Sequence, residues 1–358
     1  MSRKEGLDYA PTGKAEPVCG PGDFPFAATG LDHGHVYGQC NGLIEAGGEL
    51  RWVYDADPRK VEEFCGRYPQ ARPADRFERI LEDSEIRMVT AAAVPCERGP
   101  LGIRVMEAGK DYFTDKTPFT TLDQLAEARE TVKRTGRKYA VYYSERLHVE
   151  CAVHAGNLVK DGVIGRVLQV LGVGPHRLSA DKRPAWFFER EKYGGIIADL
   201  GSHQIEQFLY YSGSENAEIL HAAVANYAHK MDYPELEDFG EVNLLGSSGA
   251  VNYFRVDWFT PDGLGAWGDG RTLILGTEGY IELRKYIDVG IGPEQDTLFL
   301  VTGDKEERMQ LHGKVGFPFF GELILDCLQG TETAMTQKHT FRAAELCLLA
   351  QEQARRLE

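Results

Sequence analysis

The chain contains 358 residues, of which 42% are hydrophobic and 27% are charged, a composition typical of globular proteins and unlike that of disordered or fibrous ones. At roughly 150 residues per domain, this length indicates two domains. The 55 acidic and 40 basic residues leave a net charge of −15, which disfavours a nucleic-acid partner because phosphate backbones would be repelled.

Three features predict a cytoplasmic protein with no membrane partner. No run of about 18 apolar residues is present, so the sequence contains no candidate membrane span. The opening residues, 1–6, carry positive charges without a following apolar stretch, which is unlike a secretory signal. The 7 cysteines are odd in number, scattered and without a C-x-x-C pair, a pattern that suits a reducing compartment and argues against a disulfide framework or a cysteine zinc site.

Glycine and proline are frequent in residues 1–22, which predicts an N-terminal arm outside the first core. Strands and helices then alternate regularly over residues 23–145. The predicted strands are 24–29, 50–54, 88–94, 111–114 and 138–143, and the predicted helices include 36–44, 58–68 and 122–135. Such alternation predicts an α/β domain of Rossmann type, with a doubly wound parallel sheet that binds ligands at the carboxyl ends of its strands.

The pattern changes near Ser144, and residues 146–358 are predicted to form a second, α+β domain. Its predicted helices are 149–160, 198–211, 318–329 and 340–356, and its predicted strands include 166–174, 251–259, 272–275 and 280–283. A run of strands after a βα region indicates one large, mainly antiparallel sheet, and C-terminal helices complete the domain. This domain is expected to hold the substrate and to support oligomerisation.

A glycine-rich turn joins the first predicted strand to the first helix. Gly30, Gly34 and Gly38 could provide the tight bend and the close backbone approach that a dinucleotide pyrophosphate needs. The spacing is not G-x-G-x-x-G, because Asp32 stands where the second glycine is expected. Asp55 ends the second strand 21 residues after Gly34, where an acid would accept hydrogen bonds from ribose hydroxyls and repel a 2′-phosphate.

Two other interpretations of this region remain open. The glycines could simply shape a loop, as short motifs often do. Alternatively, His33 and His35 have a spacing seen in metal sites, and Asp199 and His203 could complete a metal hydrolase or isomerase site. No H-E-x-x-H motif accompanies them, so no metal site is predicted. Asp57, directly before Pro58, is interpreted as a helix cap.

Two motifs then point to a known family. The fourth strand leads into Thr114-Asp115-Lys116-Thr117-Pro118, and Gly194-Gly195-Ile196-Ile197-Ala198-Asp199-Leu200-Gly201-Ser202-His203 follows about 80 residues later. Together with the order of strands and helices, these motifs resemble the Gfo/Idh/MocA family of NAD(P)-dependent oxidoreductases, the relatives of glucose–fructose oxidoreductase and inositol dehydrogenase. The resemblance extends from Phe24 to the C-terminal helices, and includes Ala93-Val94-Pro95 and residues 105–110 and 158–167.

The resemblance implies a catalytic trio of Lys116, Asp199 and His203. Histidine titrates near neutral pH, so His203 would exchange the hydroxyl proton while Lys116 stabilises alkoxide character and Asp199 orients the substrate or His203. The residues expected to bind the cofactor are Gly30, Asp32, His33, Gly34, His35, Asp55, Val94, Pro95, Asp115 and Lys116. The residues expected to bind the substrate are Arg146, His176 and Trp186.

The chain also departs from the family pattern. The family's Glu-Lys-Pro element is Asp-Lys-Thr-Pro here, and the histidine often found four residues after the proline of strand three is Gly99. These differences predict a dinucleotide site of the family type and an unusual substrate pocket.

The function predicted from the sequence is hydride transfer between a nicotinamide cofactor and a hydroxyl or carbonyl carbon of a sugar, polyol or sugar derivative. Asp55 favours NAD over NADP. The alternatives are redox-neutral use of NAD in sugar elimination or glycoside cleavage, and a dinucleotide-binding protein without catalysis. The expected partners are a small-molecule substrate and further copies of the chain, as a homodimer or homotetramer.

Overall fold

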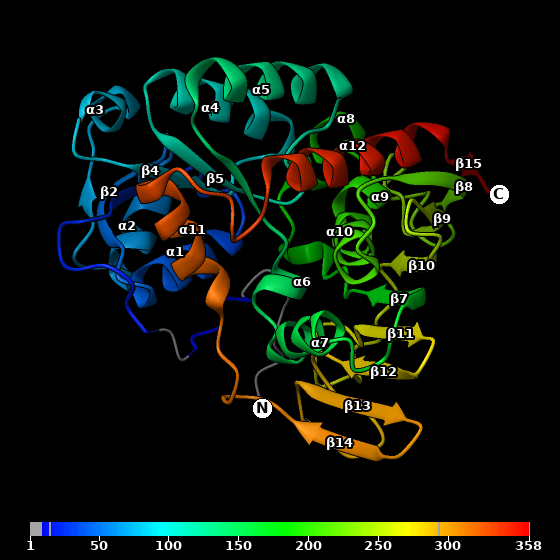
Figure 1. Cartoon of the computed structure of the whole chain (residues 1–358). Helices are drawn as coiled ribbons and strands as arrows, with labels where there is room; N and C mark the ends of the chain where they lie inside the picture. The colour runs from blue at the N-terminus through cyan, green and yellow to red at the C-terminus, as the bar shows by residue number, and fades with distance from the viewer. Residues whose placement is uncertain (1–8, 14–15, 293, 358) are drawn as a thin grey trace. The chain divides into compact units, whose positions relative to one another are not determined.

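The computed structural model describes residues 9–13, 16–292 and 294–357, which form two compact units (Figure 1). The described residues of the first unit lie within 9–142 and 316–341, and those of the second lie within 143–315 and 342–357. The chain therefore passes between units at Tyr142, three residues before the boundary predicted from the sequence. Residues 316–341 were expected in the second domain, but they pack with the first unit.

The first unit is built on a six-stranded parallel sheet in the order β3-β2-β1-β4-β5-β6, which confirms the predicted Rossmann architecture. The strands are β1 (Pro25–Thr29), β2 (Glu49–Tyr54), β3 (Arg72–Pro73), β4 (Met88–Ala91), β5 (Asp111–Asp115) and β6 (Tyr139–Tyr142). Every residue of β1, β4, β5 and β6 is buried, as expected for strands covered on both faces. The sequence did not predict β3, because two residues carry no periodic pattern.

The helices of the first unit cover both faces of this sheet: α4 and α5 lie on one face, and α1 and α2 on the other (Figure 1). The helices are α1 (His35–Glu45), α2 (Pro58–Arg67), α3 (Phe77–Glu82), α4 (Pro95–Glu107), α5 (Leu122–Thr135) and α11 (Pro318–Gln329). The Asp57 carboxylate accepts a hydrogen bond from the backbone N–H of Arg59, so the predicted cap of α2 is confirmed. Helix α11 packs against α1, where a Cβ on Gly42 would lie 2.4 Å from the Phe320 ring.

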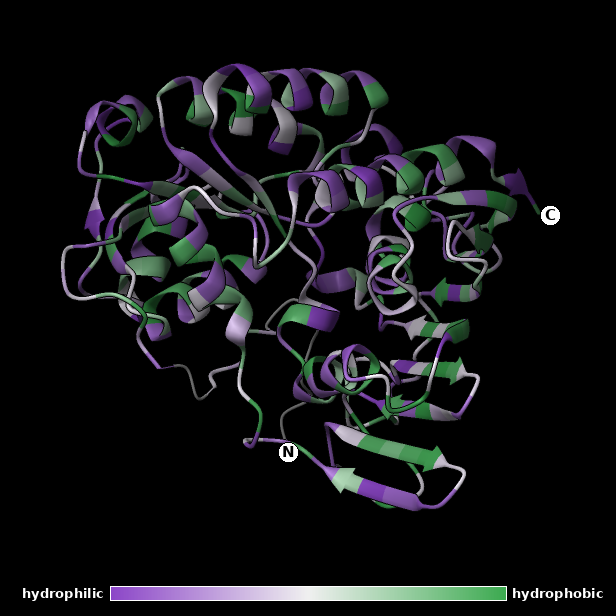
Figure 2. Cartoon of the chain, viewed as in Figure 1, coloured by the Kyte–Doolittle hydropathy of each residue, from purple (hydrophilic) through white to green (hydrophobic). Residues whose placement is uncertain are grey.

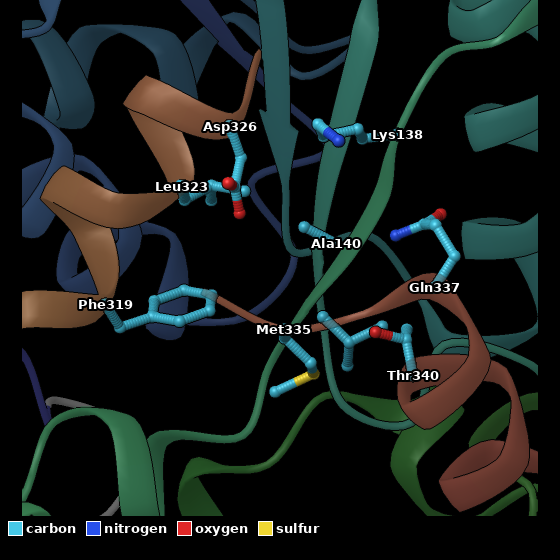
Figure 3. A pocket seen from close by; sticks show the side chains of 9 residues that line it. Lys138, Ala140, Phe319, Leu323, Asp326, Met335, Gln337 and Thr340 are labelled. Carbon is cyan, nitrogen blue, oxygen red and sulfur yellow. The ribbon is translucent and has the colours of Figure 1, made fainter. Parts of the chain in front are cut away.

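The edge strand β6 is closed by a side chain from the returning segment. The Gln337 amide accepts a hydrogen bond from the Tyr139 N–H at 2.9 Å and donates one to the Tyr139 carbonyl at 3.2 Å, which replaces a neighbouring strand. Gln337 lines a small hollow beside β6 together with Phe319, Met335 and Thr340 (Figure 3). The hollow is formed by residues that attach the returning segment to the sheet, so we assign it a structural role.

The second unit is built on a nine-stranded sheet in the order β14-β13-β12-β11-β7-β10-β9-β8-β15. The strands are β7 (Val167–Pro175), β8 (Ala217–Ala225), β9 (Phe239–Gly246), β10 (Val251–Asp257), β11 (Arg271–Gly276), β12 (Gly279–Arg284), β13 (Thr297–Thr302), β14 (Glu306–Gln310) and β15 (Arg355–Arg356). Among the described strand pairs of this sheet, only β10–β7 and β15–β8 are parallel, so the predicted mainly antiparallel sheet is confirmed.

Helices α7 and α10 contact the sheet of the second unit, chiefly through β12 and β7. The helices of this unit are α6 (Ser144–Leu147), α7 (Glu150–Lys160), α8 (Arg190–Tyr193), α9 (Ile196–Asp199) and α10 (Gly201–Ser212), with α12 (Gln337–Gln353) entering it at Arg342 and short 3₁₀ turns at Ala180–Lys182 and Ala185–Phe188. Strand β13 is largely hydrophobic, whereas its edge neighbour β14 is hydrophilic (Figure 2). A charged edge strand discourages unwanted pairing with other chains.

Within the described ranges, no helix combines the length and hydrophobicity needed to span a membrane. All seven cysteines belong to these ranges, and none forms a disulfide.

Candidate active site

The turn between β1 and α1 has the geometry that a dinucleotide pyrophosphate requires. Gly30 has a φ of +57°, and a Cβ there would lie 2.7 Å from the Ala93 Cβ, so only glycine fits. Helix α1 begins directly after Gly34, which has no side chain to cap it, and the His33 Nδ1 accepts a hydrogen bond from the His35 N–H at 3.2 Å. The positive end of the helix dipole faces this turn, which suits a phosphate. Gly38 allows close packing inside the unit, because a Cβ there would lie 2.6 Å from the Tyr142 hydroxyl.

Asp55 reaches back from the end of β2 to this turn. Its carboxylate accepts hydrogen bonds from the N–H groups of Leu31, at 2.7 Å, and Asp57, at 2.9 Å. The side chain is 8% exposed. The acid expected beside the ribose thus lies against the glycine turn, and the residues present fit a dinucleotide.

Asp32 occupies the turn position where the second glycine was expected, and it is paired with a cation that the sequence did not reveal. The Lys60 Nζ lies 2.5 Å from the Asp32 Oδ1 and 3.9 Å from the Asp55 Oδ1. Burial lowers the pKa of Lys60, but the three carboxylates around it, those of Asp32, Asp55 and Asp57, raise it overall. Lys60 therefore remains charged and neutralises part of this acidic group.

A buried charged network joins the turn to the end of β5. The Asp115 carboxylate lies 2.9 Å from the His35 Nδ1 and 3.3 Å from an Arg98 nitrogen, and it accepts a hydrogen bond from the Lys116 N–H at 2.8 Å. Burial alone would raise the pKa of Asp115, but His35 and Arg98 hold it far below its ordinary range. The pKa of His33 is lowered well below its usual value by burial and by His35, so its ring is neutral.

Arg98 fixes the loop that carries Lys116. Its guanidinium donates to the carbonyls of Ala93, at 2.7 Å, Lys116 and Thr117, and its side chain is 1% exposed. The Lys116–Thr117 peptide bond is cis. Val94 and Pro95 lie at the start of α4, the helix that carries Arg98. Because Arg98 bonds both to Ala93, after β4, and to the loop after β5, it links the ends of these two strands. Arg98 was not predicted, because one arginine in a helix carries no signal of the carbonyls it will meet.

The structure brings the ten expected cofactor residues into the first unit, around the carboxyl ends of β1, β2, β4 and β5. His33, His35 and Asp115 also place three donor atoms within 4.8 Å of one another, as a metal site would. Arg98 already pairs with Asp115, and a cation there would face its positive charge. Asp199 and His203, the other ligands considered for a metal, belong to the second unit.

Asp199 and His203 lie one helical turn apart. Helices α9 and α10 meet at Leu200, whose φ of −80° and ψ of −36° are helical, so the predicted four-residue spacing is preserved. The two side chains are 8% and 2% exposed. Gly195 has a φ of +95°, and a Cβ there would lie 2.4 Å from the Gln351 side chain, so its immediate neighbour is α12.

A buried ion pair lies under the helix that carries His203. The Lys285 Nζ is 2.9 Å from the Glu145 Oε2, and the two side chains are 0% and 2% exposed. The same carboxylate oxygen accepts a bond from the Gln204 amide at 3.0 Å, and Lys285 donates to the Gln207 Oε1 at 2.7 Å. Burial would raise the pKa of Glu145, but Lys285, followed by His203, lowers it far below its ordinary value. No motif in the sequence indicated this pair.

The three expected substrate residues also lie in the second unit. Arg146 binds Glu206 through two guanidinium nitrogens, at 2.8 and 2.5 Å, and its cation lies 3.9 Å from the centre of the Tyr210 ring. His176 packs against Trp267, with ring centres 4.4 Å apart. Trp186 is half-buried beside Phe187.

The expected trio is divided between the units, with Lys116 in the first and Asp199 and His203 in the second. Lys116 directly follows β5, whereas Asp199 and His203 lie on the consecutive helices α9 and α10.

Comparison with known proteins establishes the family. Residues 18–143 match the model of an oxidoreductase family with an NAD-binding Rossmann fold, and residues 153–282 match the GFO/IDH/MocA C-terminal domain. The chain belongs to the Gfo/Idh/MocA oxidoreductases. A crystal structure from Erwinia carotovora atroseptica SCRI1043, described as a candidate oxidoreductase, is 48% identical, with a TM-score of 0.90 over 94% of this chain and 100% of that one.

Curated relatives match over shorter spans. A D-xylose dehydrogenase of Paenarthrobacter nicotinovorans is 26% identical over 40% of this chain and 38% of its own length. A scyllo-inositol 2-dehydrogenase (NAD(+)) of Bacillus subtilis strain 168 is 27% identical over 56% of each chain. The matched region thus spans about two fifths to just over half of these relatives' lengths.

Proposed function

We propose that this protein is an NAD-dependent dehydrogenase or reductase that acts on a CH–OH group of a sugar, polyol or sugar derivative. The observation that carries this proposal is the Asp55 carboxylate, which ends β2 and is bonded to the glycine turn at Leu31. An acid at this position binds ribose hydroxyls and repels a 2′-phosphate. The sugar and inositol dehydrogenases among the relatives support the substrate class.

In the proposed reaction the cofactor accepts or supplies the hydride. His203 takes the hydroxyl proton during oxidation and returns it during reduction. Lys116 donates a hydrogen bond to the same substrate oxygen and stabilises its alkoxide character in the transition state. Asp199, one turn from His203, orients the substrate or the imidazole. Arg98 holds the backbone at Lys116.

We assign His176 and Trp186 to substrate contact and Arg146 to the edge of that pocket, where Glu206 would hold its guanidinium in place. The thiols support a reducing, cytoplasmic setting. The test of the function is a screen of NAD⁺ reduction across sugars, inositols and uronic derivatives, followed by absorbance. Reduction with none of these classes would contradict the proposal.

Replacing Asp55 with asparagine should change the choice of cofactor. Asn keeps an oxygen for the Leu31 N–H but removes the charge, so we expect the NADP⁺ dissociation constant to fall about tenfold while NAD⁺ binding weakens about threefold. Titrating both cofactors against protein fluorescence measures the two constants. Glu130→Gln is the control, because that carboxylate is 71% exposed on α5 and pairs with Lys133, and it should leave the ratio unchanged. An unchanged ratio in Asp55→Asn would contradict the assigned role.

We also propose that the sheet of the second unit supports self-association. Leu245, Tyr253, Leu275 and Tyr280 are 37%, 37%, 40% and 39% exposed, and Leu275 pairs directly with Tyr280. Apolar side chains gathered on one sheet face are typical of an interface. Leu275→Arg should lower the mass measured by light scattering, whereas Leu328→Arg, on α11 at 39% exposure, should leave it unchanged. Equal masses for both variants and the parent would place the interface elsewhere.

A further inference from the structure

Asp32 presents an electrostatic problem for the proposed cofactor site. It stands where a dinucleotide turn has a glycine so that the backbone can approach the pyrophosphate. Asp55 is the acid that serves the ribose, so Asp32 adds a second negative charge to a site for a negatively charged ligand. An uncompensated carboxylate at this position would oppose binding.

Lys60 supplies the compensating charge from the first turn of α2. Its Nζ is 2.5 Å from the Asp32 Oδ1, and the two side chains are 34% and 19% exposed. It is also 3.9 Å from the Asp55 Oδ1. Its other charged neighbour, Asp57, is occupied by the N–H of Arg59 and by its guanidinium. Lys60 is thus placed to neutralise the charge of Asp32, its nearer partner. The Asp55 carboxylate then stays available to bind the ribose hydroxyls.

We propose that Lys60 and Asp32 form a compensating pair that permits dinucleotide binding to this altered glycine turn and sets its preference between NAD and NADP. The proposal rests on the proposed function, because it concerns the same cofactor site. The pair is electrically neutral as long as both members are present. Loss of Lys60 leaves two carboxylates facing the ligand, and loss of the Asp32 carboxylate leaves an ammonium group beside Asp55.

The two single variants should therefore move cofactor preference in opposite directions. Lys60→Met should raise the NAD⁺ dissociation constant about tenfold and the NADP⁺ constant further, because the 2′-phosphate adds negative charge. Asp32→Gly should lower the NADP⁺ constant relative to that of NAD⁺, since the freed ammonium can meet the 2′-phosphate. The double variant should return NAD⁺ binding to within about threefold of the parent, which is a coupling that independent residues would not show.

The experiment measures NAD⁺ and NADP⁺ binding to the full-length chain by calorimetry, with thermal melting of each variant to verify folding. Lys133→Met is the control, because Lys133 lies on α5, is 64% exposed and pairs with Glu130, away from the glycine turn. It should bind both cofactors like the parent. The proposal is overturned if Lys60→Met also behaves like the parent, or if both single variants shift the preference in the same direction. A parent protein that binds neither dinucleotide would instead reject the proposed function itself.

Discussion

Replacing Lys116 with methionine should reduce turnover by at least about a hundredfold while NAD⁺ binding changes less than about threefold. Methionine fills a similar volume but offers no hydrogen bond to the developing alkoxide, and removal of one such donor typically has an effect of this size. Backbone geometry should persist, because Arg98 and Asp115 hold the loop through the main chain of residues 116 and 117. Steady-state rates with the substrate found in the screen, together with calorimetric NAD⁺ titration, measure both effects.

Lys133→Met is the control for this experiment, because Lys133 lies on α5, is 64% exposed and pairs with Glu130. It should leave turnover unchanged. The variant Lys116→Met/His203→Gln then tests whether the two groups act on one reacting centre, since residues that act as a unit give strongly non-additive losses. Normal turnover in Lys116→Met would contradict its catalytic role, and additive losses in the double variant would contradict a shared centre.

Most of the first unit could be predicted because its signals are local. Helix α5 has the predicted bounds, since Thr121 caps its start and Gly136, with a φ of +66°, ends it. The first and fourth strands, β1 and β4, are short runs of apolar and small residues, and Asp55 was placed by its position directly after the predicted second strand. These features depend on residues that are close in sequence, so a single chain reveals them.

The features that were missed depend on contacts between distant residues. Residues 316–341 return to the first unit, where the Gln337 side chain bonds the backbone of β6 at Tyr139, 198 positions earlier in the chain. No local sequence pattern predicts a partner at such a distance. Lys60 meets Asp32 over 28 positions, and Lys285 meets Glu145 over 140. For the two ion pairs the sequence shows only ordinary charged residues, and the fold brings each one to its counter-charge.

Removing Lys285 should strongly destabilise the second unit, because it leaves a buried charge without its partner. Lys285→Met leaves the Glu145 carboxylate buried beneath α10 without its cation, and removing one partner of a buried pair typically lowers the free energy of unfolding by about 3–5 kcal/mol. Urea unfolding at neutral pH, followed by circular dichroism, measures the loss. Lys305→Met is the control, because its pair with Glu307 is exposed, and its effect should be about 0–1 kcal/mol.

The pH dependence of that loss identifies the charge as its cause. In the parent the pKa of Glu145 is far below its usual value, so the stability that the pair contributes is present above the unfolded pKa of about 4 and declines as the pH falls below it. In Lys285→Met, burial without a cation raises the pKa of Glu145, so lowering the pH lets the carboxyl group take up a proton and removes the unpaired charge. The stability gap between parent and variant should therefore narrow from pH 7 to pH 4.

A second variant, Glu145→Leu/Lys285→Met, removes both charges. It should be more stable than Lys285→Met at neutral pH and should show little of this pH dependence, although Gln204 and Gln207 lose hydrogen bonds in it. A gap that stays constant with pH would attribute the loss to packing and would contradict the electrostatic role.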